Sequence, residues 1–164
     1  MPTPPANAWA ASAPANTGVD TGLDTARPVL DFGAHIPFVQ MLGLVLHRMQ
    51  DGQSELSYAL QPQHTNSFGI THGGVSMTLL DVTMACAARS LAPELGVVTI
   101  EMKTSFMQPA RGQLLACGRL LHRTRSMAFT EATIYDAQGQ VCSHATGTFR
   151  YVPRTQSDSG PATD

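Results

Sequence analysis

A long helix that is apolar on more than one face constrains the fold of this chain more than any other feature. The run GVSMTLLDVTMACAA, residues 74–88, holds one acidic side chain and no basic one. Apolar side chains recur at helical spacing in two stripes: Val75, Leu79, Val82 and Cys86, and Met77, Leu80, Met84 and Ala88. A helix of this kind is buried on more than one side. We therefore expect the rest of the chain to wrap around it.

The acidic side chain in this helix is Asp81, and burial would remove water from its carboxylate. Such a group either finds polar partners or has a raised pKa. The turn His72-Gly73-Gly74 opens the same helix, and free backbone N–H groups gather at a helix N-terminus. A perturbed carboxylate near such donors is typical of an active site. The alternative is a salt-bridged or solvent-facing aspartate without a catalytic role.

The segments around this helix predict strands and one short helix. Residues 44–49 and 54–61 form a hairpin that turns at Asp51-Gly52, a dipeptide suited to positions with φ > 0. The other expected elements are a short helix at 35–41 and strands at 98–106, 113–122, 127–135 and 141–152.

The strand at 98–106 shows the clearest alternation. Two sets of residues are expected on opposite faces: Val98, Ile100, Met102 and Phe106, and Thr99, Glu101, Lys103 and Ser105. This period of two predicts a half-buried strand.

Two strands, one long buried helix and then four antiparallel strands in a meander make an α+β pattern. Because a flat sheet covers only one side of a helix, we expect a curled antiparallel sheet of about six strands wrapped around it. The alternative is an ordinary sandwich of one helix on one sheet.

Length and composition favour a single folded domain at residues 31–153. We expect residues 1–30 to form a disordered or loosely packed extension and residues 154–164 a flexible tail. The extension lacks the basic and apolar regions of a secretory signal. No segment reaches the ~20 apolar residues that a membrane span needs.

Charge and cysteine usage narrow the partners and the compartment. Charged residues make up 13% of the chain and the net charge is −2, which disfavours a nucleic-acid partner. Cys86, Cys117 and Cys142 form no CxxC pair, which indicates reduced thiols in a cytoplasmic protein. The alternative is one disulfide with one free thiol.

Several short motifs lie at fixed distances from Asp81. Asn66 precedes it by 15 residues and His72-Gly73-Gly74 begins nine residues before it, while QPARG at 108–112 and ATGTF at 145–149 follow. Together these motifs resemble the hotdog-fold acyl-CoA thioesterases of the 4-hydroxybenzoyl-CoA thioesterase superfamily. The branch is the one that includes the phenylacetate-pathway thioesterases and their animal mitochondrial relatives.

This resemblance implies a hotdog fold that hydrolyses an acyl-CoA at sites shared between two subunits. The expected assembly is a homodimer, or a homotetramer built from two such dimers. Asp81 is expected either to activate water or to attack the carbonyl carbon, and the sequence does not choose between them. Gly73 is expected to present its backbone N–H to the thioester oxygen. A glycine has no Cβ to obstruct the substrate, and the helix dipole stabilises negative charge that develops there.

The same resemblance assigns three more side chains to the site. Asn66 is expected to hydrogen-bond near the catalytic carboxylate and the attacking water, and Thr99 to position that water. His72 is expected to fix the turn or to contact the thioester. Each has a structural alternative: an Asx turn for Asn66, a turn-forming histidine for His72 and an exposed strand threonine for Thr99.

CoA carries phosphates, and Arg123, Thr124, Arg125 and Ser126 form a local cluster of basic and hydroxyl groups. The resemblance places nucleotide contacts around this turn and a substrate contact at Gly74. The alternative is a solvated loop with two exposed arginines.

One departure separates the chain from the sister bacterial 4-hydroxybenzoyl-CoA branch, which has a threonine one helical turn after its catalytic glutamate. Here that position is Ala85. The six histidines lack metal-ligand spacing, so we expect no metal and no cofactor other than the CoA of the substrate. Two other functions stay open: a non-catalytic acyl-CoA-binding protein, and a hotdog enoyl-thioester hydratase or dehydratase.

Overall fold

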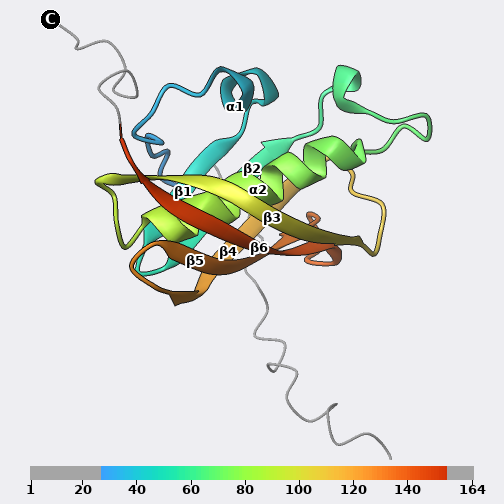
Figure 1. The fold of residues 1–164 in the computed structure, drawn as a ribbon. Helices are drawn as coiled ribbons and strands as arrows, with labels where there is room; N and C mark the ends of the chain where they lie inside the picture. The colour runs from blue at the N-terminus through green and yellow to red at the C-terminus, as the bar shows by residue number, and fades with distance from the viewer. Residues whose placement is uncertain (1–26, 155–164) are drawn as a thin grey trace, which may run out of the picture.

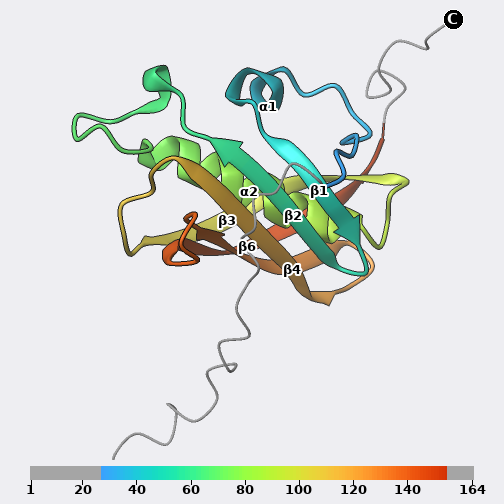
Figure 2. The same ribbon diagram turned by 180° about the vertical axis from the view of Figure 1, so that it is seen from behind.

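The computed structural model describes residues 27–154, which form a six-stranded antiparallel sheet curled around one long helix (Figures 1 and 2). Residues 1–26 and 155–164, which hold most of the predicted extension and tail, lie outside the described part of the chain. The elements in chain order are α1 (Pro37–Leu42), β1 (Val45–Gln50), β2 (Gln53–Ala59), η2 (Pro62–His64), α2 (Gly73–Arg89), β3 (Leu95–Phe106), β4 (Gln113–Arg123), β5 (Met127–Tyr135) and β6 (Val141–Pro153). The predicted fold class is confirmed.

The strand order is β1-β2-β4-β5-β6-β3, so the predicted four-strand meander is wrong at its first member. β3 lies at the far edge of the sheet and pairs with β6, whereas β4 returns to pair with β2. The reason is that α2 crosses the curled sheet after β2, so β3 begins at the opposite edge, where it pairs with β6. The edge of β2 is left open for β4.

Most of the circumference of α2 is buried in the curl of the sheet. Its buried residues are Ser76, Leu79, Leu80, Thr83, Met84, Cys86, Ala87 and Ala88. Two strand glycines allow the close approach: a Cβ at Gly118 would lie 2.8 Å from Thr83 Cγ2, and one at Gly147 would lie 3.0 Å from Met84 Cε. Met77 and Asp81 lie on the remaining face of the helix, where Met77 is 40% exposed.

A β-bulge in β3 corrects the predicted alternation. Thr99 pairs with Phe149 and Glu101 with Thr148, so Ile100 is the extra residue between them. The bulge shifts the pairing of β3 with β6 by one residue. Before the bulge, Thr99 lies on the same face of the sheet as its partner Phe149, which is buried. Thr99 therefore faces α2, whereas Ile100, predicted on the apolar face, is 55% exposed.

Residues just before α1 pack along β1. The N–H of Leu30 donates to the carbonyl of Leu46 at 2.8 Å, which pairs Leu30 with β1. Arg89 of α2 donates to the carbonyl of Phe32 at 3.0 Å. These contacts hold the segment before α1 over the exposed face of the second half of α2.

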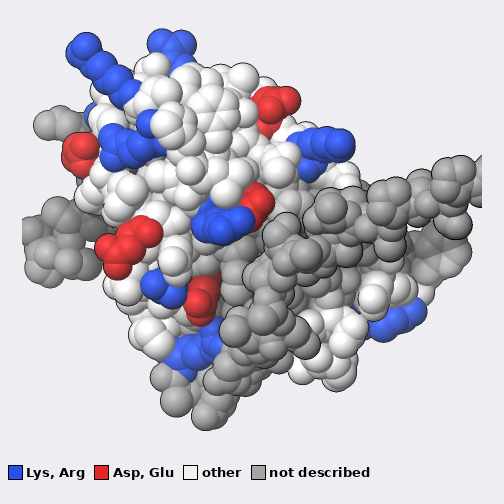
Figure 3. Space-filling model, turned by 90° about the horizontal axis from the view of Figure 1, so that it is seen from below, with Lys and Arg blue, Asp and Glu red and all other residues white. Residues whose placement is uncertain are grey.

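The surface of the described residues carries charges of both signs. Figure 3 shows basic and acidic side chains interspersed on the lower face, with no continuous basic patch among the coloured residues. No helix within residues 27–154 combines the length and the hydropathy that a membrane crossing requires. Cys86, Cys117 and Cys142 are free thiols.

Candidate active site

Asp81 is half-buried in the middle of α2, on the face that the sheet leaves open. The hydroxyl of Thr99 donates a hydrogen bond of 2.8 Å to its Oδ1. Burial raises the pKa of the Asp81 carboxyl above its ordinary value, and the hydrogen bond from Thr99 offsets part of that rise. Asp81 forms no ion pair with a basic side chain of the described residues, so the salt-bridged alternative is wrong for this part of the chain.

A cavity of about 200 Å³ opens beside this carboxylate; we call it the Asp81 cavity. Its walls come from the segment before α1, from α2 and from β3, and its lining includes Phe32, Ile36, Asp81, Cys86, Arg89 and Thr99. Burial raises the pKa of Cys86 to about 12, so this cysteine stays a thiol and is a poor nucleophile. Asp81 is the only carboxylate in the lining.

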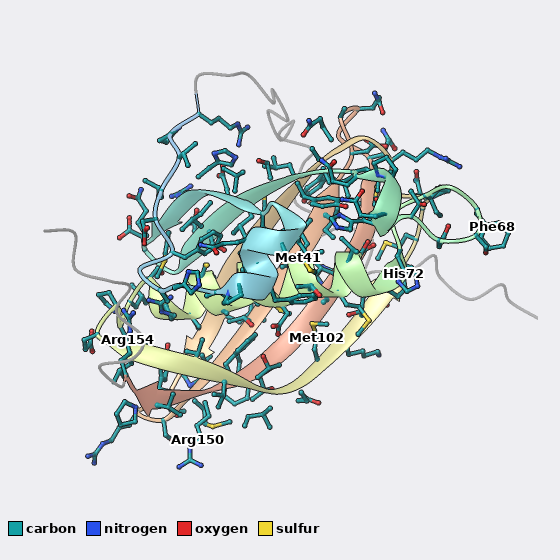
Figure 4. All side chains as sticks on the ribbon, turned by 90° about the horizontal axis from the view of Figure 1, so that it is seen from above. Met41, Phe68, His72, Met102, Arg150 and Arg154 are labelled. Atoms are coloured by element: carbon teal, nitrogen blue, oxygen red, sulfur yellow. The ribbon has the colours of Figure 1, made fainter. Side chains whose placement is uncertain are left out.

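His72 is the N-cap residue of α2, and Figure 4 shows it at the beginning of that helix. Its Nδ1 accepts a hydrogen bond of 3.0 Å from the N–H of Gly74, which explains why the helix starts here. The side chain thus has the turn-fixing role that was one of its two predicted roles. Gly74 is exposed, but its N–H is already used in this cap.

Gly73 is the first residue of α2, and its N–H has no acceptor among the described residues. A Cβ added here would lie 3.4 Å from Cζ of Phe106, so a glycine leaves the approach to the N–H open. A free N–H at a helix N-terminus is a suitable donor for an oxyanion.

Asn66 lies in the loop before α2 and shapes that loop. Its Oδ1 accepts from the N–H of Phe68 at 2.9 Å and from the N–H of Ile70 at 3.4 Å, which is an Asx turn. The Asx turn, which was the alternative to a catalytic role for Asn66, is therefore present. Its side-chain amide has no acceptor among the described residues and remains able to donate. Phe68, at the tip of this loop, projects away from the body of the molecule (Figure 4).

A second cavity, of about 350 Å³, is lined by both Asn66 and Gly73; we call it the Gly73 cavity. Asp81 does not line it, and Gly73 does not line the Asp81 cavity. The two residues are eight positions apart on one helix, which is about 12 Å at 1.5 Å per residue. One chain therefore does not bring its own Asp81 and Gly73 to a single thioester group.

The predicted nucleotide-binding turn lies at the far end of α2. Arg123 donates to the carbonyl of Leu91 at 2.9 Å, and its guanidinium lies over the Tyr151 ring at 5.2 Å from the centroid. The Thr124 hydroxyl accepts from the N–H groups of Ser126 and Met127, which closes the turn.

The structure thus engages Arg123 and Thr124 in the fold. The side chains of Arg125 and Ser126 form no side-chain hydrogen bond or ion pair with the described residues and remain available to a ligand.

Sequence reasoning missed part of both cavities. Arg89 lines the Asp81 cavity, and the hydroxyl residues Thr71, Ser76 and Ser143 line the Gly73 cavity. Ser76 follows the His72-Gly73-Gly74 turn closely, which is a usable signal, but nothing in the sequence places Ser143 beside it. Among the described residues, no group of three metal-ligating side chains is close enough to hold an ion.

Comparison with known proteins gives a consistent result. The profile of the thioesterase superfamily matches residues 68–143. A putative esterase of Saccharolobus solfataricus, SSO1253, is 26% identical over 119 residues, which is 72% of this chain and 79% of that protein. The medium/long-chain acyl-CoA thioesterase YigI of Escherichia coli K12 is 24% identical over 135 residues, 72% of this chain and 87% of that protein.

Solved structures share the same fold. Conserved protein PA5202 of Pseudomonas aeruginosa superposes with a TM-score of 0.70 at 25% identity, covering 73% of this chain and 97% of that one. The E. coli PaaI protein from the phenylacetic acid degradation operon superposes with a TM-score of 0.69 at 20% identity, covering 74% and 88%. The profile match, the relatives and the shared fold make this chain similar to proteins of the thioesterase superfamily.

Proposed function

We propose that this protein hydrolyses an acyl-CoA to a free acid and CoA, with Asp81 as its general base or nucleophile. The similarity to the thioesterase superfamily supports thioester hydrolysis, and the CoA ester as substrate and the residue roles are part of the proposal. The observation that carries it is Asp81 itself. This carboxylate is half-buried, has no cationic partner among the described residues, and opens onto a cavity.

The environment of Asp81 suits attack on a thioester. Its raised pKa makes the carboxylate a stronger base than an exposed aspartate. The hydroxyl of Thr99 holds Oδ1, so Oδ2 is free to take a proton from water or to attack the carbonyl carbon. In the first case water adds to the carbonyl carbon. In the second an acyl–aspartate anhydride forms, and water then hydrolyses it.

The negative charge that develops on the thioester oxygen needs a donor, and the N–H of Gly73 fits this role. The dipole of α2 adds to the effect at its N-terminus. As the tetrahedral intermediate collapses, the C–S bond breaks and the CoA thiolate leaves, taking a proton to become the free thiol. None of these steps requires a metal or a further cofactor.

A complete site needs two chains, because Asp81 and Gly73 of one chain are about 12 Å apart along α2. We propose a homodimer, alone or within a homotetramer, in which Asp81 of one protomer faces Asn66 and Gly73 of its partner. Two observations support this. Exposed apolar side chains lie on α2 and β3 near the site: Met77 is one helical turn before Asp81 and 40% exposed, and Val98 and Ile100, which flank Thr99 on β3, are 46% and 55% exposed. In addition, β3 is a long sheet edge that pairs on one side only.

The phosphates of CoA are separated from its thioester by the pantetheine arm, so their contacts lie away from Asp81. We propose the turn at 123–126 for this role, with Arg125 and Ser126 as its direct contacts. Arg123 and Thr124 then act by holding the turn in place, since their side chains are engaged with the fold. The cytoplasmic location remains a prediction from the three free cysteines.

The proposal is tested by thiol release from phenylacetyl-CoA, benzoyl-CoA, hexanoyl-CoA and palmitoyl-CoA. We expect turnover of at least one ester by the natural protein, and a loss of about 10²–10⁴-fold in the Asp81→Asn variant. A variant that keeps more than about a tenth of the natural rate would exclude Asp81 as the base or nucleophile. If no ester releases thiol but CoA esters still raise the melting temperature, the protein is a binding protein instead.

A further inference from the structure

Arg89, in the last turn of α2, is a half-buried cation without an acidic partner. Its Nη1 donates to the carbonyl of Phe32 at 3.0 Å, and its Nε–H is buried without an acceptor. Among the described residues, no carboxylate lies within ion-pair distance of its guanidinium. Burial lowers the pKa of Arg89, but an arginine side chain stays protonated in proteins. A half-buried charge without a counter-charge is unfavourable, so this one calls for an explanation.

A second arginine reaches the same place. Arg154, which follows the end of β6 (Figure 4), donates through Nη2 to the carbonyl of Gly33. A Cβ built on Gly33 would lie 3.5 Å from Nη2 of Arg89 and 3.8 Å from Nη1 of Arg154, so the two guanidinium groups meet over this glycine. In addition to burial, the charge of Arg154 lowers the pKa of Arg89. An anion bound beside the two groups would offset their repulsion.

Arg89 lines two spaces that adjoin each other. One is the Asp81 cavity; the other, which we call the distal space, has a volume of about 320 Å³ and is also lined by Arg154. Ala85 lines both spaces as well. Asp81, Ala85 and Arg89 follow one another at intervals of four residues, so they lie along one face of α2. A ligand group that extends from Asp81 along this face therefore passes Ala85 before it reaches Arg89.

The lining of the Asp81 cavity is mainly apolar. It includes Phe32, Ile36, Val82, Ala85 and Val97. Methylene groups suit such walls, whereas the amide groups of the pantetheine arm of CoA would lose their hydrogen bonds with water there. The group that reaches Arg89 is thus the end of an acyl chain. A carboxylate at that end would present two oxygens to the guanidinium and supply the missing counter-charge.

The helix sets the length of the acyl chain. Asp81 and Arg89 are eight residues apart, which is about 12 Å along α2 at 1.5 Å per residue. An extended chain advances about 3.3–3.6 Å for every three bonds, so about ten bonds cover the whole distance. Because a long side chain on a helix points back toward the N-terminus, the guanidinium lies nearer to Asp81 than its own Cα does. Chains of about five to eight carbons are therefore expected to fit.

We propose that the Asp81 cavity accepts acyl groups that end in a carboxylate, and that Arg89 binds this carboxylate. Arg89 is then a specificity-determining residue, and Arg154 adds positive charge beside it. The substrate class is the mono-CoA ester of a dicarboxylic acid, and hydrolysis releases the free dicarboxylic acid and CoA. This inference rests on the proposed function, because it requires the thioester carbonyl of a CoA ester to lie at Asp81.

Three pairs of CoA esters with equal carbon numbers test the proposal without any variant. They are pentanoyl-CoA and glutaryl-CoA, hexanoyl-CoA and adipyl-CoA, and octanoyl-CoA and suberyl-CoA. The readout is the ratio of kcat/KM for the dicarboxylic member to kcat/KM for the monocarboxylic member, measured by thiol release. We expect the natural protein to prefer the dicarboxylic member of at least one pair by about tenfold or more, the effect of one hydrogen bond to a charged group.

Variants of Arg89 connect this preference to the cavity. Arg89→Gln should lower the ratio about 30-fold or more, because the carboxylate then enters without a counter-charge. Arg89→Lys keeps a positive charge without the planar fork and should lower the ratio less. Since the ratio compares two esters in one protein, a loss of folded protein that slows both of them cancels.

Arg150→Gln is the matched control. Arg150 is an exposed arginine on β6 and lines neither the Asp81 cavity nor the distal space. Its replacement removes the same charge from the chain and should leave the ratio unchanged.

Two results would overturn the inference and leave the proposed function standing. One is that the natural protein prefers the dicarboxylic member of none of the three pairs. The other is an Arg89→Gln variant that slows both members of each pair equally. Weaker inhibition of that variant by free CoA would then assign Arg89 to a phosphate of CoA, and unchanged inhibition would assign it to the fold. Absence of thiol release from every ester by the natural protein would instead overturn the proposed function and this inference with it.

Discussion

The two cavities beside α2 have opposite chemistry. The Asp81 cavity holds a carboxylate with a raised pKa, and its only other polar side chains are Cys86, Arg89 and Thr99. The Gly73 cavity holds a free backbone N–H, an asparagine and three buried hydroxyls, and no titratable side chain lines it. One can supply a base or nucleophile and the other can stabilise an oxyanion.

Hydrolysis of a thioester requires both kinds of group within a few ångströms of one carbonyl. In our proposal each protomer therefore holds two half-sites, and a complete site combines one half-site from each of two protomers. The two cavities should also differ in their response to mutation, because one supplies a titrating carboxylate and the other a neutral backbone donor.

In the Gly73 cavity, the largest effect is expected from removing the N–H of Gly73. Gly73→Pro deletes that donor at the first position of α2, where proline is well tolerated, and His72 already has the extended backbone (φ −59°, ψ 139°) that precedes proline. We expect kcat to fall about 10²–10³-fold. Gly73→Ala is the control, since it keeps the N–H and adds only a Cβ 3.4 Å from Phe106. Equal losses in the two variants would show that crowding, not the lost donor, is responsible.

A smaller effect is expected in the Asp81 cavity from Thr99→Val. The hydrogen bond from Thr99 lowers the pKa of Asp81, so losing it should move the acidic limb of the pH profile of kcat/KM to higher pH. The rate at neutral pH should fall about tenfold if Thr99 also orients the carboxylate. Thr99→Ser keeps the hydroxyl and should restore the natural profile. An unshifted acidic limb in Thr99→Val would contradict this account of the site.

His72 allows a test of whether it acts only as a helix cap. His72→Ala removes the acceptor for the Gly74 N–H and should cost about 1 kcal/mol of folding free energy, or ~3 °C in Tm. His72→Asn provides another good capping side chain and should recover that stability. If His72 only fixes the turn, the asparagine variant also recovers activity. Full stability with lost activity would instead assign His72 a contact with the thioester.

The smallest effect concerns stability and the charge on Asp81. Because burial raises the pKa of Asp81 in the folded state, the folded protein holds this proton more tightly than the unfolded chain does. Its contribution to stability therefore decreases as pH rises from the ordinary aspartate pKa through the raised one. Asp81→Asn removes the buried charge, so it should increase Tm at pH 8 and change it less at pH 4. Thermal scans at both values check this, and a lower Tm at pH 8 would contradict it.

The sequence predicts the elements of this fold closely, because each element carries a strong local pattern. Every expected helix and strand is present, with ends that differ by a few residues at most. The sequence predicts that the carboxylate of Asp81 is removed from water, and the structure confirms a half-buried carboxylate with a raised pKa. Its catalytic role remains a prediction, as do the roles of Asn66 and Gly73.

What the sequence does not predict depends on contacts between distant segments. The bulge at Ile100 adds one residue to β3, and a period-of-two pattern carries no signal of that insertion. It is this bulge that allows Thr99 to reach Asp81. Likewise, Thr71, Ser76 and Ser143 meet only because β6 crosses the first turn of α2, and the crossover of β3 to the far edge decides that arrangement.

The most direct test of a shared site is complementation between two inactive chains. Asp81→Asn and Gly73→Pro chains, each with a different affinity tag, are co-expressed, and the species that carries both tags is purified. In a mixed dimer one site combines the intact Asp81 of one protomer with the intact Gly73 of its partner, while the other site lacks both. We predict about half the natural rate of thiol release from the mixed dimer. A mixed dimer as inactive as its two parents would contradict the account.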